Sequence, residues 1–434
     1  MKSLWHYTAL CGSFPELKQN IQTDILVIGG GLSGLLCAYF LNKDGADTVL
    51  VESGKICGGI SGNTTAKITS QHGIVYSDLI SRFGVNKAKL YLEANNSALE
   101  EYRRMCAGID CDFEEKDAYV YAKNDIEKIK KEHEALKILG FNADLVRDIP
   151  LPFSVAGAIR FKNQAQFNPL KFAYSVSKGL TVYEHTKVRE LKGTVAVTDM
   201  GNITAKKIIV ATHFPFINKH GSYFMKLYQD RSYVIALENA PNVNGMYIDE
   251  EEHGLSFRNY GDLLLLGGGG HRTGKDGENY EELRKFARKY YPQAKEKYYW
   301  AAQDCMTLDG VPYVGHYSAQ TKNMFVATGF NKWGMTSSMA AAKILCDLVQ
   351  DRPNKYAELF SPARTVLRPQ LICNAFESVC GLLSIGTKRC PHLGCALKWN
   401  KAEHTWDCPC HGSRFDENGK LLDNPATGDL KNKR

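Results

Sequence analysis

The chain has 434 residues, of which 44% are hydrophobic and 23% charged, and its formal net charge is +7. A chain of this length is too long to fold around a single hydrophobic core, so two or three domains are expected. The mild charge and the lack of a long basic block exclude a nucleic-acid partner. No signal-peptide pattern and no apolar run of spanning length are found, so we expect a cytoplasmic protein with no membrane span.

The first predicted elements form one βαβ unit. Residues 24–28 read Asp-Ile-Leu-Val-Ile, an apolar run typical of a buried parallel strand. A helical stretch follows at residues 35–42, and residues 48–51, Thr-Val-Leu-Val, predict a second strand. This order of strand, helix and strand indicates the start of a dinucleotide-binding fold.

The turn of this unit carries a G-x-G-x-x-G pattern. Gly29 allows a tight turn, Gly31 lets the backbone approach a pyrophosphate, and Gly34 lets the helix pack closely on the strand. The helix points its free N–H groups at the phosphates. Glu52 ends the second strand, where an acid accepts hydrogen bonds from ribose hydroxyls. A glycine-rich turn without a ligand is the alternative, but this context favours a dinucleotide.

The middle of the chain alternates between helical and strand-like segments. Most of residues 77–139 is predicted to be helical, and strands are predicted at residues 181–188 and 206–211. Short apolar runs between residues 223 and 275 indicate a separate sheet. Residues 281–297 predict a further helix.

A strand that ends in glycine is predicted at residues 323–329, and a helix at residues 337–349. From about residue 364 the composition shifts toward Cys, His, Gly and Pro, which indicates a domain boundary. We therefore expect one large domain over residues 1–363. A linker and a small module should fill residues 364–434.

Four segments of the large domain resemble the FAD-dependent amino-acid oxidase superfamily, which includes D-amino-acid, glycine and sarcosine oxidases. They are residues 58–67, 207–213, 309–315 and 327–336. The resemblance implies an α/β fold with noncovalent FAD in a Rossmann-like part. That part should comprise about residues 22–76, 150–220 and 300–350, and an interleaved α+β substrate part residues 77–149 and 221–299.

The same resemblance implies which residues surround the FAD. In the family, a second Gly/Ser-rich loop lies against the phosphates, one strand lies near the adenine, and a late glycine-rich segment passes under the isoalloxazine ring. Carried over to this sequence, these features implicate Ser61, Thr64, Thr65, Val188, Gly329, Gly334, Met335 and Thr336.

Four of the thirteen cysteines lie close together near the C-terminus, accompanied by two histidines. Cys390-x-His392 and Cys408-x-x-His411 form two loops, each with one thiolate and one imidazole. The other nine cysteines are scattered, and we interpret them as reduced thiols. Zinc also accepts Cys and His ligands, although zinc sites favour C-x-x-C pairs over C-x-H.

This two-loop arrangement resembles the Rieske family. The resemblance implies a [2Fe–2S] cluster with Cys390 and Cys408 on one iron and His392 and His411 on the other. Only residues 364–389 lie between the large domain and the first cluster loop. We therefore expect a small, β-rich module that packs against the flavin domain for support.

The resemblance extends to the residues beside the ligands. It implies a disulfide between Cys395 and Cys410. Ser413 matches a serine that hydrogen-bonds a cluster sulfur, whereas Phe415 replaces a tyrosine of high-potential relatives. With one donor fewer, an intermediate reduction potential is expected.

Together the resemblances imply an FAD-dependent oxidoreductase acting on CH–NH or CH–NH2 donors. A small amine or amino acid would give hydride to the flavin, and the cluster would pass single electrons to an external acceptor, such as a redox protein. Arg258 is the candidate clamp for a substrate carboxylate, and His213 and Trp333 are expected near the flavin. For each candidate in the predicted substrate sheet a packing role is the alternative; these candidates are Arg231, Tyr233, Arg258, Tyr260 and His271.

Two other interpretations stay open at this point. Electrons could run in the opposite direction, from a ferredoxin-like donor through the cluster to the flavin, which would make the chain a reductase. Alternatively, the flavin domain could have lost catalysis and serve as a redox sensor. The sequence alone does not separate these from the dehydrogenase.

Overall fold

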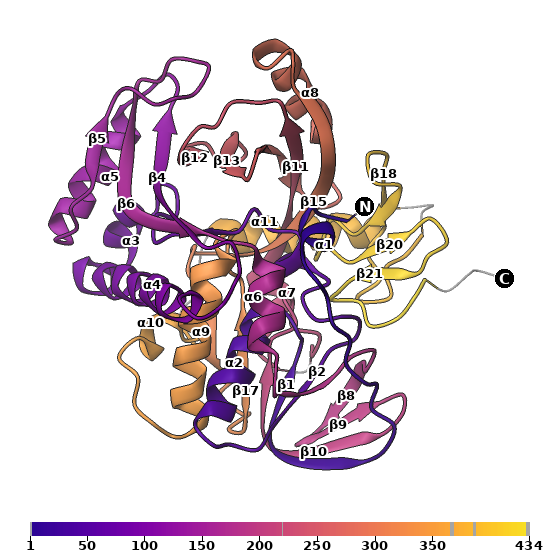
Figure 1. The fold of residues 1–434 in the computed structure, drawn as a ribbon. Coiled ribbons are helices and arrows are strands. Elements are labelled where there is room, and N and C mark those ends of the chain that lie inside the picture. The colour runs from indigo at the N-terminus through magenta and orange to yellow at the C-terminus, as the bar shows by residue number, and fades with distance from the viewer. Residues whose placement is uncertain (1, 219, 365–368, 385–387, 431–434) are drawn as a thin grey trace.

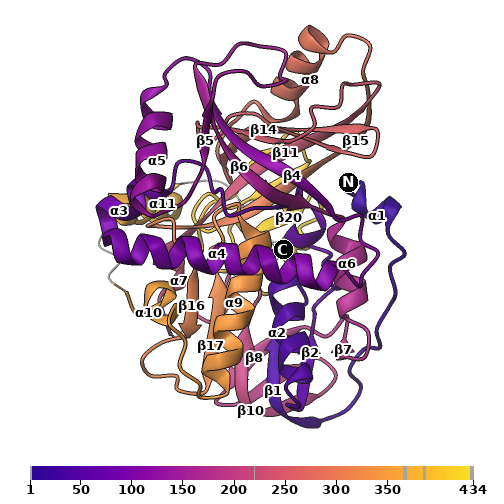
Figure 2. The same cartoon turned by 60° about the vertical axis from the view of Figure 1, so that its left-hand side comes forward.

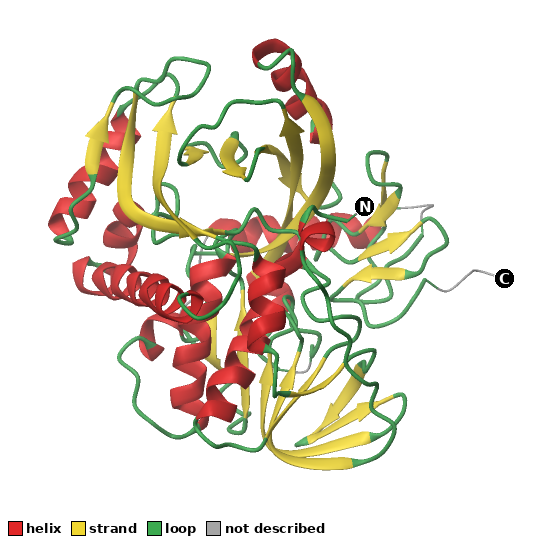
Figure 3. Cartoon of the chain, in the orientation of Figure 1, coloured by secondary structure: helices red, strands yellow, loops and turns green. Residues whose placement is uncertain are grey.

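The structure is a computed structural model that describes residues 2–218, 220–364, 369–384 and 388–430. Two large sheets and one small sheet account for its strands, and Figure 3 shows them as separate groups. The small sheet belongs to the C-terminal module, which lies to the right in Figure 1, beside both large sheets. No helix among the described residues is long and apolar enough to cross a lipid bilayer.

The first sheet has eight strands and contains the predicted βαβ unit. Its main path runs β16–β17–β10–β1–β2–β7, with β8 and β9 paired beside β10. Strand β1 pairs in parallel with both β2 and β10. The strands are β1 (Ile21–Ile28), β2 (Thr48–Val51), β7 (Thr181–Tyr183), β8 (Val188–Lys192), β9 (Val195–Thr198), β10 (Asn202–Val210), β16 (Tyr313–His316) and β17 (Met324–Thr328).

Both faces of β1 are buried, which explains its continuous apolar sequence. Val27 packs in one core cluster with Leu35, whereas Leu26 packs in another with Val210. Helix α2 packs on α9, and α4 crosses α9 (Figure 2). The helices of this region are α1 (Trp5–Thr8), α2 (Leu32–Lys43), α4 (Val85–Cys106), α6 (Pro169–Val176), α9 (Gly334–Val349) and α10 (Ala357–Phe360), with a 3-10 turn η1 (Ile60–Gly62).

The second sheet has nine strands, in the order β15–β11–β14–β13–β12–β4–β6–β3 with β5 paired to β6. Most neighbours are antiparallel, while β12 and β4 run parallel. Its helices are α3 (Tyr76–Phe83), α5 (Glu127–Ile138) and α8 (Asn279–Tyr290). Its strands are β3 (Lys67–Ile68), β4 (Glu114–Ala122), β5 (Asp144–Val146), β6 (Gly157–Gln166), β11 (Leu227–Glu238), β12 (Met246–Asp249), β13 (Ser256–Tyr260), β14 (Leu263–Arg272) and β15 (Lys295–Thr307).

The C-terminal module is small and antiparallel. It consists of β18 (Lys398–Asn400), β19 (Thr405–Asp407), β20 (Arg414–Asp416) and β21 (Leu421–Asp423), in that order across the sheet. Helix α11 (Pro369–Leu383) precedes the module and contacts α7 (Tyr223–Lys226) of the large domain. The expected β-rich module is therefore confirmed.

Three sequence predictions need correction. The helix predicted over residues 77–139 is interrupted by β4, whose alternating Tyr and Val residues suit a strand between β6 and β12. The helix predicted over residues 281–297 ends at Tyr290, because Pro292 cannot continue it and β15 follows. Strand β6 lies in the second sheet, although the prediction assigned residues 150–220 to the FAD part.

Candidate flavin and cluster sites

The turn between β1 and α2 has room for glycine only. A Cβ atom at Gly34 would lie 1.9 Å from the Gly29 carbonyl oxygen, and one at Gly29 would lie 2.5 Å from the Ala211 oxygen. Gly29 also has a φ of +108°, which other residues rarely adopt. Strand, turn and helix are therefore held in close contact, and the start of α2 is fixed in place.

Polar groups surround this turn. Glu52 accepts hydrogen bonds from the backbone N–H groups of Gly30 (2.8 Å) and Gly54 (2.7 Å). Ser61 Oγ accepts one from the Leu32 N–H at the start of α2 (3.0 Å). Ser33 Oγ is buried and has no hydrogen-bond partner among the described residues. An orphaned hydroxyl at a helix N-terminus fits a bound phosphate group, so the turn fits FAD.

Two cavities of about 390 and 710 Å³ adjoin the turn. They share Gly31, Ser61 and His213 in their walls, so the two cavities adjoin at this turn. Gly34, Gly329 and Thr336 do not line either cavity. The two glycines allow close contacts behind it, and the Thr336 hydroxyl donates to the Thr69 carbonyl at 3.0 Å. The predicted FAD residues in the walls are Gly29, Gly31, Glu52, Ser61, Thr64, Thr65, Val188, Gly334 and Met335.

Of the three predicted catalytic residues, only Tyr233 lines the smaller cavity. Arg258 is fully buried, and its guanidinium donates to the carbonyls of Thr65 and Ala66, both at 2.8 Å. His271 lies outside the walls and bonds the Tyr233 hydroxyl at 2.9 Å. In the structure Nη1 of Arg258 holds the loop before β3, its Nη2 is buried without a partner among the described residues, and His271 contacts Tyr233. The role of Arg258 as a substrate clamp stays a prediction.

The remaining candidates are His213, Trp333, Tyr260 and Arg231, and they too differ in whether they line a cavity. His213 lines both cavities, and Trp333 lines the smaller one with its ring 4.8 Å from that of His72. Tyr260 donates to Asp112 at 2.6 Å, outside both cavities. Arg231 forms an ion pair with Glu403 of the C-terminal module.

Several charged residues of the smaller cavity were not singled out from the sequence, and two of them, Lys67 and Asp304, have strongly shifted pKa values. Lys67 donates to Thr65 Oγ1 at 3.2 Å, and burial together with nearby Arg258 lowers its pKa to about 7. Burial raises the pKa of Asp304 to about 6. Neither forms an ion pair within the described chain. Lys67 is the one basic residue of the Gly/Ser/Thr-rich loop, which is a usable signal, whereas no pattern marks Asp304.

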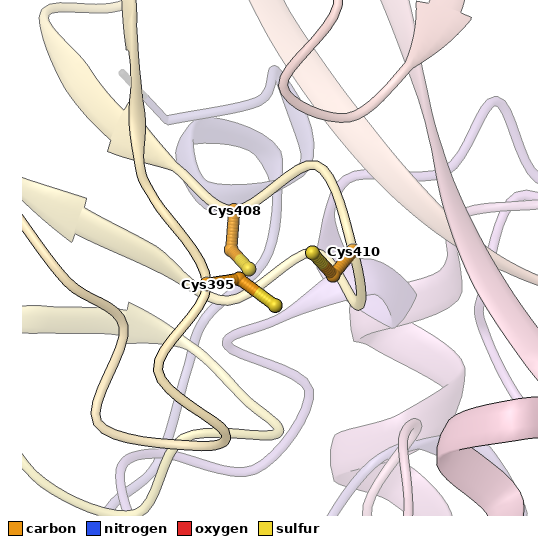
Figure 4. Close-up of side chains that lie close together, drawn as sticks. All are labelled: Cys395, Cys408 and Cys410. Atoms are coloured by element: carbon orange, nitrogen blue, oxygen red, sulfur yellow. The ribbon is translucent and has the colours of Figure 1, made fainter. Parts of the chain in front are cut away.

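The cysteines of the module converge on one point. The thiols of Cys395, Cys408 and Cys410 are all buried and lie within 4.8 Å of one another, turned inward as Figure 4 shows. Cys390 is buried beside them and interacts with Cys408. Cys395 and Cys410 are free thiols in the structure, so the disulfide is absent here and stays a prediction.

The two histidines complete the site. Their rings lie 4.9 Å apart, and Nδ1 of both His392 and His411 is buried without a hydrogen-bond partner among the described residues. Burial and the neighbouring His411 lower the pKa of His392 to about 3, and burial and Arg272 lower that of His411 to about 4. Neutral imidazoles with free nitrogens beside thiols fit a Rieske [2Fe–2S] cluster.

The residues beside the ligands lie close to the cluster position. The Ser413 hydroxyl interacts with the Cys390 thiol and accepts the Ala426 N–H at 3.0 Å. Phe415 is fully buried in the core of the module and has no hydroxyl to offer a sulfur. The sulfur site therefore has a serine donor but no tyrosine donor.

Comparison with protein families agrees with this geometry. A family model described as FAD dependent oxidoreductase matches residues 24–348, and one described as Rieske [2Fe-2S] domain matches residues 375–433. The chain is an FAD-dependent oxidoreductase of this family. It also carries a C-terminal Rieske domain, so FAD and a [2Fe–2S] cluster are its cofactors.

Individual relatives of this FAD-dependent oxidoreductase share one or both parts. YhfW of Bacillus subtilis (strain 168), described as a Rieske 2Fe-2S iron-sulfur protein, is 36% identical and aligns over 99% of this chain and 97% of its own. The gamma-glutamylputrescine oxidoreductase of Escherichia coli (strain K12) is 24% identical over 79% of this chain and 87% of its own. The glycine oxidase structure from Geobacillus kaustophilus has a TM-score of 0.67 at 19% identity, covering 80% of this chain and 99% of its own.

In this oxidoreductase, side chains of the flavin domain hold the Rieske loops. Gln229 donates to the His411 carbonyl, and Gln303 donates to the Gly412 carbonyl, at 3.1 and 2.9 Å. Asn424 of the Rieske domain donates back to the Thr212 carbonyl at 2.6 Å. The fit is tight, because a Cβ atom at Gly412 would lie 2.6 Å from the Gln229 side chain.

Proposed function

We propose that this chain dehydrogenates a small amine or amino acid and delivers the electrons singly, through its Rieske cluster, to an external acceptor. A bound flavin accepts two electrons as hydride, whereas a [2Fe–2S] cluster carries one electron at a time. A chain that holds both is therefore suited to convert a two-electron oxidation into single-electron steps.

One observation carries this proposal. His213 lines both flavin cavities, and its Nε2 lies 3.1 Å from Oε1 of Gln229. The amide nitrogen of the same Gln229 donates to the carbonyl of the cluster ligand His411. Three residues in hydrogen-bond contact therefore join the flavin cavity to the cluster loops, which supports electron exchange within one molecule.

The charges of the smaller cavity support an amine substrate. Asp304 is mostly ionised at neutral pH and favours a cationic ligand. Lys67, with its pKa near 7, can take a proton at Nζ from the substrate ammonium and leave the free amine that hydride transfer requires. The name of the Escherichia coli relative, an oxidoreductase of an amine, supports the same class of substrate.

Anaerobic mixing of the holoprotein with a panel of amines and amino acids tests the proposal. A substrate should bleach the flavin absorbance, and the EPR signal of the reduced cluster should follow. If no compound bleaches the flavin but a reduced ferredoxin reduces cluster and flavin in turn, the reductase interpretation is correct. If neither donor changes the redox state, a sensor is indicated and the proposed dehydrogenase is wrong.

A further inference from the structure

The loop before β3 has five consecutive carbonyl groups that side chains from elsewhere in the chain bind. The loop comprises residues 62–66, from the end of η1 to the start of β3. Four side chains donate to its carbonyls: Ser3 to Gly62, Trp300 to Asn63, Trp5 to Thr64, and Arg258 to both Thr65 and Ala66. The last four of these carbonyls lie 2.7–2.9 Å from their donors. One side of the loop is therefore fixed along its whole length.

The donors come from three distant parts of the chain. Ser3 and Trp5 belong to the N-terminal segment, Arg258 to β13 and Trp300 to β15. All four side chains are fully buried, and none of them lines either cavity. The Arg258 guanidinium carbon also lies 5.5 Å from the centre of the Trp5 ring. The N-terminal segment, which precedes the dinucleotide-binding unit in the sequence, thus packs behind the wall of the smaller cavity.

The opposite side of the loop faces that cavity. Thr64 and Thr65 line it. In a trans peptide the C=O and N–H groups of one unit point in opposite directions. The Asn63 carbonyl points to Trp300, so the N–H of Thr64 points away from this donor. The Thr64 carbonyl points to Trp5, so the N–H of Thr65 points away likewise. Neither N–H has an acceptor among the described residues.

This side of the loop suits a phosphate group. Successive free N–H groups form a concave site for an anion. The Thr64 hydroxyl accepts from the Ala66 N–H at 2.9 Å and the Thr65 hydroxyl from Lys67 Nζ at 3.2 Å, so each hydroxyl can still donate its own proton. Gly31 at the start of α2 lines the same cavity. A carbonyl turned to this side would repel the anion, and the four donors hold every loop carbonyl on the other side.

We propose that the N-terminal segment is part of the flavin site. Ser3 and Trp5 are positioning residues: together with Trp300 and Arg258, they keep the N–H groups of Thr64 and Thr65 directed at the pyrophosphate of FAD. The proposal concerns the bound cofactor and involves no substrate. Its test can therefore fail or succeed independently of the proposed dehydrogenation.

Release of FAD from the diluted holoprotein, followed by flavin fluorescence, gives the dissociation constant that tests this proposal. Trp5→Phe keeps an aromatic ring but removes the N–H, and it should raise the dissociation constant about tenfold. Ser3→Ala should raise it less, about threefold, because the N–H of the peptide that it holds already donates to Ile60. The phosphorus NMR resonances of the bound FAD should shift in Trp5→Phe, which a fold that is merely less stable would not cause.

Tyr247→Phe is the matched control. It removes another buried donor, which bonds the Val243 carbonyl at 3.0 Å outside the loop, so the dissociation constant and the phosphorus resonances should stay as in wild type. The proposal is overturned if Trp5→Phe holds FAD as tightly as wild type, or if Tyr247→Phe loses FAD equally. If Trp5→Phe does not fold, as judged by cluster absorbance, Ser3→Ala decides, and an unchanged dissociation constant there overturns the proposal.

Discussion

The flavin site and the cluster site of this chain are built in different ways. The flavin turn depends on main-chain contacts within one sheet, where Gly29 and Gly34 leave no room for a Cβ atom. The cluster loops sit on four short strands, and Gln229, Gln303 and Arg231 of the other domain hold that module in place. The glycine turn is thus fixed by strands of its own sheet, whereas the cluster loops are held by side chains of another domain.

Removal of a cluster ligand should produce the largest effect and separate the two sites. Cys408→Ser should abolish the cluster, because serine is a poor ligand for iron in place of a thiolate. The flavin should stay bound, since the glycine turn and the whole wall of the smaller cavity belong to the flavin domain. Iron, acid-labile sulfide and flavin per chain are the measurements, and Cys373→Ser, an exposed thiol, should keep all three. Loss of flavin together with iron would contradict independent flavin loading.

Lys67→Met should affect the flavin side alone. With its pKa near 7, Lys67 is protonated below that pH and becomes a base above it, so wild-type flavin reduction should accelerate as pH rises through about 7. The variant should lose this pH dependence and about 10²-fold in rate. Lys67→Arg keeps the charge but cannot release its proton, so it should behave like Lys67→Met. An unchanged pH profile in stopped-flow reduction would refute the role of Lys67.

The buried ion pair between Arg231 and Glu403 should hold the module to the flavin domain. Burial raises the pKa of Glu403, but Arg231 and Arg414 outweigh this and lower it to about 2. A lowered pKa contributes stability above the unfolded value of about 4.3 that is lost as pH falls toward the folded value. Glu403→Gln should therefore lower the free energy of unfolding by about 3 kcal/mol at neutral pH.

Denaturant unfolding of the apoprotein at several pH values checks this dependence. The difference between wild type and Glu403→Gln should shrink as pH falls from about 4 to about 2. Glu417→Gln, at an exposed carboxylate of the same module, serves as control and should match wild type throughout. A constant difference across this range would show that the charge of Glu403 does not matter.

Gln229 and Gln303 both donate to the cluster loops, but only Gln229 also contacts His213. Gln229→Leu and Gln303→Leu each leave a carbonyl of the cluster loops without its hydrogen-bond donor. Each should lower the free energy of unfolding by about 1–3 kcal/mol per buried group. Only Gln229→Leu also breaks the contact between His213 and the His411 segment. Cluster reduction after flavin reduction should therefore be slower in Gln229→Leu than in Gln303→Leu. Equal rates in the two would exclude Gln229 from the route.

The smallest predicted effect concerns the cluster potential. Phe415→Tyr supplies the missing donor and should raise the midpoint potential by about 20–60 mV, the value of one hydrogen bond in a one-electron couple. Ser413→Ala should lower it by a similar amount. Protein-film titration gives both values, and no rise in Phe415→Tyr would refute the idea that the phenylalanine lowers the potential.

Sequence patterns predicted the parts of both sites that depend on local spacing. The glycines of the turn, Glu52 at the end of the next strand and the two Cys/His loops were all expected from short motifs and their spacing. The contacts of Arg258 with the carbonyls of Thr65 and Ala66 could not be predicted, because these residues belong to a distant segment that only the folded sheet brings near. The contacts of Gln229 with His213 and His411 could not be predicted either, because a single glutamine in a strand belongs to no recognisable motif.

The proposed function requires that the flavin and the cluster exchange electrons inside one molecule. Photoreduction of the flavin in anaerobic holoprotein, followed by freeze-quench EPR of the cluster at several protein concentrations, tests it most directly. We predict a reduced-cluster signal that grows at the same rate at every concentration. A rate that rises in proportion to protein concentration, or a cluster that stays oxidised beside reduced flavin, would contradict the account.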